Sequence, residues 1–304
     1  MSKHAQHHRY SLRPEAVYRR RRLGLMAVVA VVAVVCTFAF QAHGKAMGPG
    51  HDAAVSVQKS VAAKTAGGRT ARPSSTKVVR SADKTAAVKP TLDSIFAGAQ
   101  YSVDVVDLAN DASVVAINTD TEYTAASTYK LFVAYSMLAA VKSGSWTWQT
   151  DLGDSTLQEC FSTMIINSDN DCPEAWLNSQ GYNTVNDQAH QLGESQTTIG
   201  YQNMQTNAAD LADFLTKLYK GSLVDADSDN LLIGDMKQQV YRDGIPSGIG
   251  DHGTVADKVG FLDGLLHDAG IVYSDKGNYV FVIMTNNSSW AAISQASSAI
   301  YSVL

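Results

Sequence analysis

Residues 125–132 read AASTYKLF, and they place Lys130 three positions after Ser127, at the start of the apolar run LFVAYSMLAAV. Residues i and i+3 lie on one face of a helix, so the Lys130 amine can reach the Ser127 oxygen. Two interpretations fit this stretch. Either Ser127 or Thr128 caps the following helix, or Ser127 is a nucleophile whose proton is taken by Lys130. The surrounding sequence has to decide between them.

The spacing Ser-x-x-Lys is not specific, because it occurs four times, starting at Ser56, Ser74, Ser81 and Ser127. Three of these copies fall within 41–90, a segment rich in Ala, Lys, Ser, Thr, Gly and Val that contains no aromatic residue. Such a composition cannot bury a core, so we expect a disordered basic linker there. Only the copy at Ser127 lies in a stretch that can form a pocket around it.

Residues 91–304 show the pattern of one folded domain, in which strands precede and follow a block of helices. The predicted strands lie at 101–109, 112–120, 255–262, 265–274 and 278–286. A final helix is expected at 288–304. We therefore predict an α/β domain of the α+β type, with one antiparallel sheet and flanking helices. The intervening helices would form an inserted all-helical lobe, with a cleft between lobe and sheet.

A lysine can act as a base only when it is neutral, and burial or a second cation lowers its pKa enough to allow this. The sequence offers polar and cationic partners for Lys130. Ser168-Asp169-Asn170 lies in a loop between two amphipathic helices, and Lys258-Val259-Gly260 lies on a predicted strand. Both are expected beside the same cleft.

The order Ser-x-x-Lys, Ser-Asp-Asn, Lys-x-Gly resembles that of the penicillin-recognising serine acyl-transferases. Residues 91–304 resemble the class A β-lactamases in particular. Flanking segments such as MIINSDND, TNAADLADFL and HDAGIVY carry the same resemblance. It implies a β-lactamase/transpeptidase-like fold and a serine hydrolase that needs no cofactor and no metal. Its substrate would be a β-lactam or a peptidoglycan peptide ending in D-alanine.

The resemblance also implies the chemical roles. Ser127 would attack the carbonyl carbon and form an acyl-enzyme, with Lys130 as base or base assistant. Ser168 would pass a proton to the leaving nitrogen. Lys258 would hold a substrate carboxylate and depress the pKa of Lys130.

Substrate binding is implied for Asn170, which would hydrogen-bond the substrate's side-chain amide, and for the Lys-x-Gly strand. The backbone N–H groups of Ser127 and Phe261 would form the oxyanion hole, next to Val259 and Gly260. Asp169 is expected to brace the loop.

Two departures from the family's pattern affect the expected activity. Val259 replaces the usual Thr or Ser, which removes a hydroxyl donor for the substrate carboxylate. The family's loop glutamate, in Glu-x-x-Leu-Asn, activates the deacylating water, and it has no counterpart here. Between Asn170 and Thr206 the only glutamates are Glu174 and Glu194, and both are expected at the surface. We therefore expect acylation to be faster than deacylation.

Cys160 and Cys172 are expected to form a disulfide if the domain is exported, and the alternative is two buried free thiols. The third cysteine, Cys36, lies in the uncharged apolar segment 23–40. That segment is about long enough to span a bilayer, and four arginines precede it in the basic tail 1–22. We expect a single-pass anchor in a bacterial cell membrane with the domain outside. Secretion after cleavage of a signal peptide is the alternative.

The charge balance excludes one class of partner. Residues 91–304 carry 26 Asp and Glu against eight Lys and Arg, a net charge of −18. So acidic a surface does not suit nucleic-acid binding. We expect a monomeric catalytic domain.

Three further features need a simple account. Ser228-Asp229-Asn230 repeats the second motif, and we expect it to cap a helix. His267-Asp268 lacks a Gly-x-Ser-x-Gly elbow, so a Ser-His-Asp triad is not expected. The alternative to an enzyme is a catalytically silent module that binds peptidoglycan through an inherited cleft.

Overall fold

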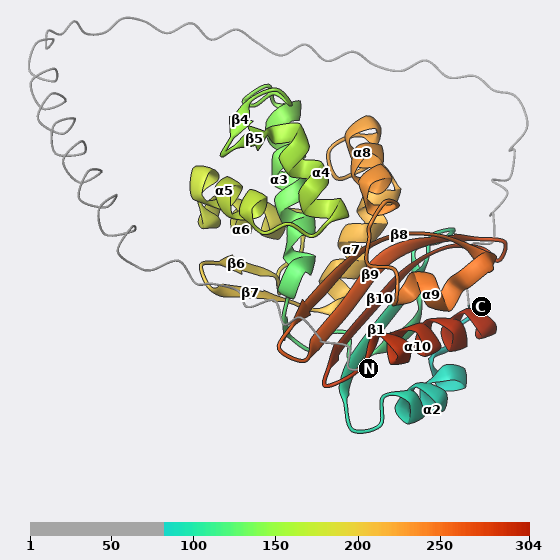
Figure 1. Ribbon diagram of the computed structural model, residues 1–304. Helices are drawn as coiled ribbons and strands as arrows, with labels where there is room; N and C mark the ends of the chain where they lie inside the picture. The colour runs from blue at the N-terminus through green and yellow to red at the C-terminus, as the bar shows by residue number, and fades with distance from the viewer. Residues whose placement is uncertain (1–81) are drawn as a thin grey trace, which may run out of the picture. The chain divides into compact units, whose positions relative to one another are not determined.

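A five-stranded antiparallel sheet in the order β2-β1-β10-β9-β8 forms the centre of the computed structural model (Figure 1). Residues 82–304 are described, and all belong to one structural unit. The strands are β1 (Gln100–Asp107), β2 (Ala112–Ile117), β8 (Gly253–Leu262), β9 (Leu265–Ser274) and β10 (Gly277–Asn286). Strand β1 pairs with β10, with Val103 opposite Ile283, so the two ends of the domain join in one sheet. The predicted antiparallel sheet is confirmed.

Three helices cover one face of this sheet: α2 (Thr85–Ile95), α9 (Ile245–Ile249) and α10 (Trp290–Val303) (Figure 1). The first of them begins before Thr91, where the sequence placed the start of the domain. Alternate residues of a strand point to opposite faces. Val103, Val105, Phe281 and Ile283 accordingly pack on this side, against Ile293 and other apolar residues of the helices.

The other face meets the helical lobe. Its helices are α3 (Lys130–Lys142), α4 (Leu157–Ile166), α5 (Asp171–Gln180), α6 (Tyr182–Leu192), α7 (Ala208–Tyr219) and α8 (Ala226–Met236). Helix α3 is the central one, since residues 130–134 are all buried. A helix that is apolar on all sides belongs in the interior. Its Phe132 ring lies edge-on to Phe214 of α7, with ring centroids 5.0 Å apart. This contact ties the lobe to the helix that packs on the sheet.

Two small sheets were not predicted. One has the order β3-β7-β6 and the other is a hairpin of two strands. The strands are β3 (Tyr123–Thr124), β4 (Asp151–Leu152), β5 (Ser155–Thr156), β6 (Thr198–Gly200) and β7 (Asn203–Thr206). Each is too short to show the alternation that reveals a strand in a sequence. The pairing of β3 with β7 matters for the site, because it places the hairpin β6–β7 beside the residues that follow β3.

The predicted basic tail 1–22, the apolar segment 23–40 and nearly all of the linker 41–90 lie outside the described residues. Within residues 82–304, no helix combines the length and the apolar character needed to cross a bilayer.

Candidate active site

Ser127 lies in a short 3-10 turn, η1 (Ala126–Tyr129), which leads from β3 directly into α3. Its side chain makes no capping bond to either helix. It accepts a hydrogen bond from Lys130 Nζ at 3.0 Å instead. The preceding residue, Ala126, has φ of 46°, a left-handed conformation that residues with a Cβ rarely adopt and that gathers at functional sites. The geometry therefore favours the nucleophile over the helix cap.

Lys130 is fully buried, although it begins a helix. Besides Ser127, its ammonium donates to the Ser168 carbonyl oxygen at 2.6 Å and to Asn170 Oδ1 at 2.7 Å. Burial lowers the pKa of Lys130 to about 8, against the opposing effect of the Asp169 charge. A fraction of Lys130 is therefore neutral near pH 7 and able to take a proton from Ser127.

Ser168 stands between two amines. Its Oγ accepts from Lys258 Nζ at 2.8 Å and lies 3.3 Å from Lys130 Nζ. The residue is left-handed, with φ of 58°, which turns the loop between α4 and α5 toward the sheet. Asp169 Oδ1 accepts from the backbone N–H of Cys172 at 3.0 Å, so this side chain holds the loop.

Lys258 comes from the middle of β8 and is also fully buried. Burial, together with the positive charge of Lys130, lowers the pKa of Lys258 to about 7. Because both amines contact Ser168, their repulsion disfavours the state in which both carry a charge. At neutral pH the pair can hold a proton on one amine and accept one on the other.

Gly260 lets β8 reach the nucleophile turn. A Cβ at this position would lie 3.0 Å from both the Ala125 carbonyl oxygen and the Ser127 nitrogen, which is closer than side chains tolerate. The glycine therefore allows the strand to pack directly on η1. This contact brings the next residue, Phe261, to the position expected for the oxyanion hole.

A cleft of about 340 Å³ opens at these residues. Four predicted site residues line it: Ser127, Ser168, Asn170 and Phe261. Lys130 and Lys258 contact two of these four from behind. Val259 is 1% exposed, and neither it nor Gly260 lines the cleft. Val259 follows Lys258 in an extended strand, so the two side chains point to opposite faces of the sheet.

The sequence analysis missed the other residues that line the cleft. They are Thr124, Ala126, Tyr129, Gln202, Met204 and Leu262. Gln202 and Met204 come from the hairpin β6–β7, whose strands are too short to predict. For Ala126, Tyr129 and Leu262, adjacency to the predicted motifs was the available signal.

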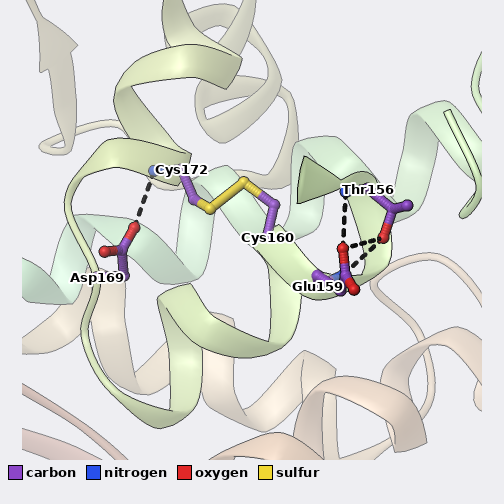
Figure 2. Close-up of a disulfide and its surroundings, with 5 residues drawn as sticks. All are labelled: Thr156, Glu159, Cys160, Asp169 and Cys172. Carbon is purple, nitrogen blue, oxygen red and sulfur yellow. Dashed lines mark hydrogen bonds between the residues drawn. A yellow bond between two sulfur atoms is a disulfide. The ribbon is translucent and has the colours of Figure 1, made fainter. Parts of the chain in front are cut away.

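The predicted disulfide is confirmed. Cys160 of α4 and Cys172 of α5 are joined, with their Cα atoms 5.2 Å apart (Figure 2). Figure 2 also shows Asp169 turned toward the Cys172 backbone and a capping box, formed by Thr156 and Glu159, that begins α4. The bridge thus closes the loop that carries Ser168 and Asn170.

The two glutamates considered for deacylation have different positions. Glu174 is exposed, as expected. The expectation that Glu194 is a surface residue is wrong, since it is 1% exposed and pairs with Lys217 at 2.7 Å. Burial raises the pKa of Glu194 to about 8. Neither glutamate lines the cleft, and within residues 82–304 no Asp or Glu does so.

His267 and Asp268 do not form a triad with Ser127. His267 Nδ1 accepts from the Thr285 N–H at 3.3 Å, which leaves Nε2–H to donate to the Thr124 carbonyl at 3.0 Å. Burial lowers the pKa of His267 to about 4, so the ring is neutral. It supports the backbone just before the nucleophile turn.

Asp268 and Asp257 form a buried acid pair behind β8. Asp257 makes an ion pair with Arg242, and Asp268 Oδ2 accepts from the Ile245 N–H at 2.7 Å. The remaining oxygens, Asp257 Oδ2 and Asp268 Oδ1, are buried without another partner. Burial and mutual repulsion raise the pKa of both carboxyl groups, so a proton shared between them satisfies both. Sequence alone could not reveal this pair, because it depends on strand register.

No group of three or more His, Cys, Asp or Glu side chains in residues 82–304 is arranged to hold a metal ion. The cleft instead combines a half-buried serine, two buried lysines, a second serine and an amide. This set can support proton transfer to and from an acylated serine.

Comparison with known proteins gives the family. A model of a beta-lactamase enzyme family matches residues 85–304. Two structures of PBP-A, one of them a mutant described as an acyl-enzyme complex with penicillin G, are 22% identical to this chain, each with a TM-score of 0.65. The alignments cover 71% of this chain and 95% and 96% of those chains.

A beta-lactamase from Sphaerobacter thermophilus DSM 20745 is 20% identical, with a TM-score of 0.64 over 72% of this chain and 95% of that one. At these identities the likeness shows the fold. None of the curated proteins matches the chain. The family model, however, spans most of the sequence, and it is the part that carries the sheet, the lobe and the cleft between them. The chain therefore belongs to the beta-lactamase enzyme family.

Proposed function

We propose that this protein is a serine hydrolase that cleaves amide bonds of the β-lactam type through an acyl-enzyme on Ser127. The observation that carries the proposal is the hydrogen bond from Lys130 Nζ to Ser127 Oγ, made by a fully buried lysine whose pKa is about 8. A solvated lysine would remain charged at neutral pH and could not accept the proton of Ser127.

The acylation step follows from the contacts. Ser127 Oγ attacks the carbonyl carbon while its proton passes to neutral Lys130. The carbonyl oxygen, now an anion, accepts hydrogen bonds from the backbone N–H groups of Ser127 and Phe261. The C–N bond then breaks, and the leaving nitrogen receives a proton from Ser168 Oγ. Lys130 or Lys258 returns a proton to Ser168, so the proton of Ser127 is balanced by the one on the product amine.

Deacylation is expected to be the slower step. It requires a base that removes a proton from an incoming water molecule. No carboxylate lines the cleft within residues 82–304, and the same lysine that served acylation would have to act again. An acyl-enzyme that persists for longer than it takes to form is the expected outcome.

The proposed setting is the outside of a bacterial cell membrane, with 23–40 as the anchor and 41–90 as a linker to a monomeric catalytic domain. The apolar segment, the arginines before it and the Cys160–Cys172 bridge support this location. Secretion after cleavage of a signal peptide remains the alternative. Candidate substrates in this compartment are β-lactams and D-alanyl peptides of peptidoglycan.

The test is intact-mass spectrometry of the wild type and of Ser127→Ala during incubation with benzylpenicillin and with its methyl ester. An adduct of the whole β-lactam on the wild type alone supports the proposal, because ring opening expels no group. A lasting adduct indicates slow deacylation, and a transient one with loss of the penicillin indicates turnover.

A catalytically silent module that binds peptidoglycan is the second candidate. It is favoured by Val259 in the third motif and by the missing carboxylate in the cleft. The intact contacts among Ser127, Lys130, Ser168 and Lys258 count against it. Binding of peptidoglycan with no adduct on Ser127 from either probe, or from a D-alanyl thioester, would favour the silent module.

A further inference from the structure

Exposed apolar side chains gather around the cleft. The large hydrophobic residues that remain exposed in residues 82–304 are Tyr201, Val240, Tyr241, Phe261 and Leu262, called here the apolar rim. Phe261 and Leu262 line the cleft and are 44% and 49% exposed. The Tyr241 ring lies edge-on to Phe261, with centroids 5.3 Å apart, and Tyr201 precedes the lining residue Gln202. A concentration of exposed apolar surface at one cleft marks a place where an apolar group binds.

Positive charge, in contrast, is missing from the surface of the cleft. Residues 82–304 contain nine lysines and one arginine, and none of these side chains lines it. The arginine, Arg242, makes an ion pair with Asp257 and donates to the Val255 carbonyl at 2.9 Å. Lys258 is fully buried and donates to Ser168 Oγ and to the Val259 carbonyl.

A carboxylate next to the scissile bond would therefore meet an unfavourable site. It would leave water for apolar walls without gaining a surface cation, and Val259 supplies no hydroxyl. The net charge of −18 on residues 91–304 would also repel it during approach. An uncharged group of the same size escapes both effects and can pack on Phe261 and Leu262.

Resting on the function proposed above, we propose that this cleft selects uncharged acyl donors. The substrate would be an amide or ester whose carboxyl group next to the scissile bond is itself esterified or amidated, as in an internal peptide bond, and whose apolar side group packs on the apolar rim.

The direct test compares benzylpenicillin with its methyl ester, two probes that differ only in the masked carboxylate. With the full-length chain, the ester should acylate Ser127 at least about tenfold faster, since one hydrogen bond to a charged group changes a rate by about that factor or more. The mass of the adduct identifies the reaction, because β-lactam opening retains the whole ester, whereas attack on the ester group would expel methanol. Added salt should speed the acid and leave the ester unaffected, because salt screens repulsion.

A pair of variants at the apolar rim sharpens the test. Leu262→Lys places a cation at the edge of the cleft, whereas Leu262→Met keeps a neutral chain of similar size. The ratio of the ester rate to the acid rate should fall by about tenfold or more in Leu262→Lys alone, in keeping with one new charge-assisted contact. An unchanged ratio in Leu262→Lys would contradict the electrostatic explanation.

The outcomes separate the two proposals. An adduct on Ser127 that forms as fast with the acid as with the ester overturns the selectivity and leaves the acyl-enzyme function intact. The absence of any adduct with either probe overturns the function and removes the basis of the inference with it.

Discussion

The tripeptide Ser-Asp-Asn occurs twice in the described part of this chain, and its two copies lead to different structures. Ser168-Asp169-Asn170 lies in the loop between α4 and α5, whereas Ser228-Asp229-Asn230 lies near the start of α8. In the first copy the serine and the asparagine point inward, to the two buried lysines. In the second copy the aspartate is the buried residue.

The contacts of the second copy are structural. The Asp229 carboxylate accepts from the backbone N–H groups of Leu223 and Val224, at 3.0 and 3.2 Å. Asp225 caps α8 by accepting from the Ser228 N–H. The expectation of a helix cap thus holds for the segment, although Asp225 rather than Ser228 is the capping residue. Identical side chains become catalytic candidates or structural supports according to the backbone conformation that holds them and to what faces them.

The largest difference between the copies should appear at the serines. Ser168→Ala should slow acylation by at least about 100-fold, the lower range for loss of a positioned proton donor. Ser228→Ala should retain the wild-type rate. The measurement is the rate of adduct formation by intact mass, with thermal unfolding as the control for folding. Equal effects of the two substitutions would show that Ser168 does not transfer the proton.

The disulfide beside the first copy should have the next largest effect. Replacing both Cys160 and Cys172 by alanine should lower the free energy of unfolding by about 2–3 kcal/mol, because the bridge closes a short loop in the unfolded chain. Urea denaturation of the oxidised proteins measures this. A loss of stability without a slower acylation would mean that the bridge does not position Ser168 and Asn170.

At the aspartates the order of the copies should reverse for stability. Asp229→Ala should cost about 1–3 kcal/mol, since it leaves two backbone N–H groups without their buried acceptor. Asp169→Ala removes one such bond and should cost about 1 kcal/mol, typical of a cap. Acylation should change only in Asp169→Ala, because this carboxylate lies near Lys130. Urea denaturation and adduct formation on the same samples decide this, and a larger stability loss at Asp169 would contradict it.

The smallest effect concerns pH. The pKa of Lys130 in the folded protein, about 8, lies below its ordinary value, so the base is protonated below that pH and neutral above it. The acylation rate should therefore rise by about tenfold between about pH 7 and about pH 9. Ser228→Ala should show the same profile. A rate that stays flat across this range would exclude Lys130 as the base.

Sequence patterns predicted long elements and local motifs well. The strands around Val103 and Ile283 alternate over enough residues to be recognised, and the amphipathic helices that carry Cys160 and Cys172 even indicated the disulfide. Predictions failed where a feature depends on distant neighbours. Glu194 looks like a surface residue in its own loop, but the fold buries it against Lys217 of α7. The hairpin that supplies Gln202 and Met204 consists of strands too short to leave a pattern.

The sequence by itself determined which chemical groups are available and in what order they occur. Ser127-x-x-Lys130, the first Ser-Asp-Asn and Lys258-x-Gly260 were recognisable because their spacing and context are local. Only the tertiary structure decided which Ser-Asp-Asn serves the site, because that depends on which copy faces the lysines.

Tertiary structure also decided the chemistry of those lysines. Burial depends on the surrounding lobe and sheet, and burial lowers the pKa of Lys130 and Lys258. It likewise placed Val259 away from the cleft and gathered the apolar rim around it. Desolvation and electrostatic contact act through space between residues that are far apart in the chain, so no local pattern can encode them.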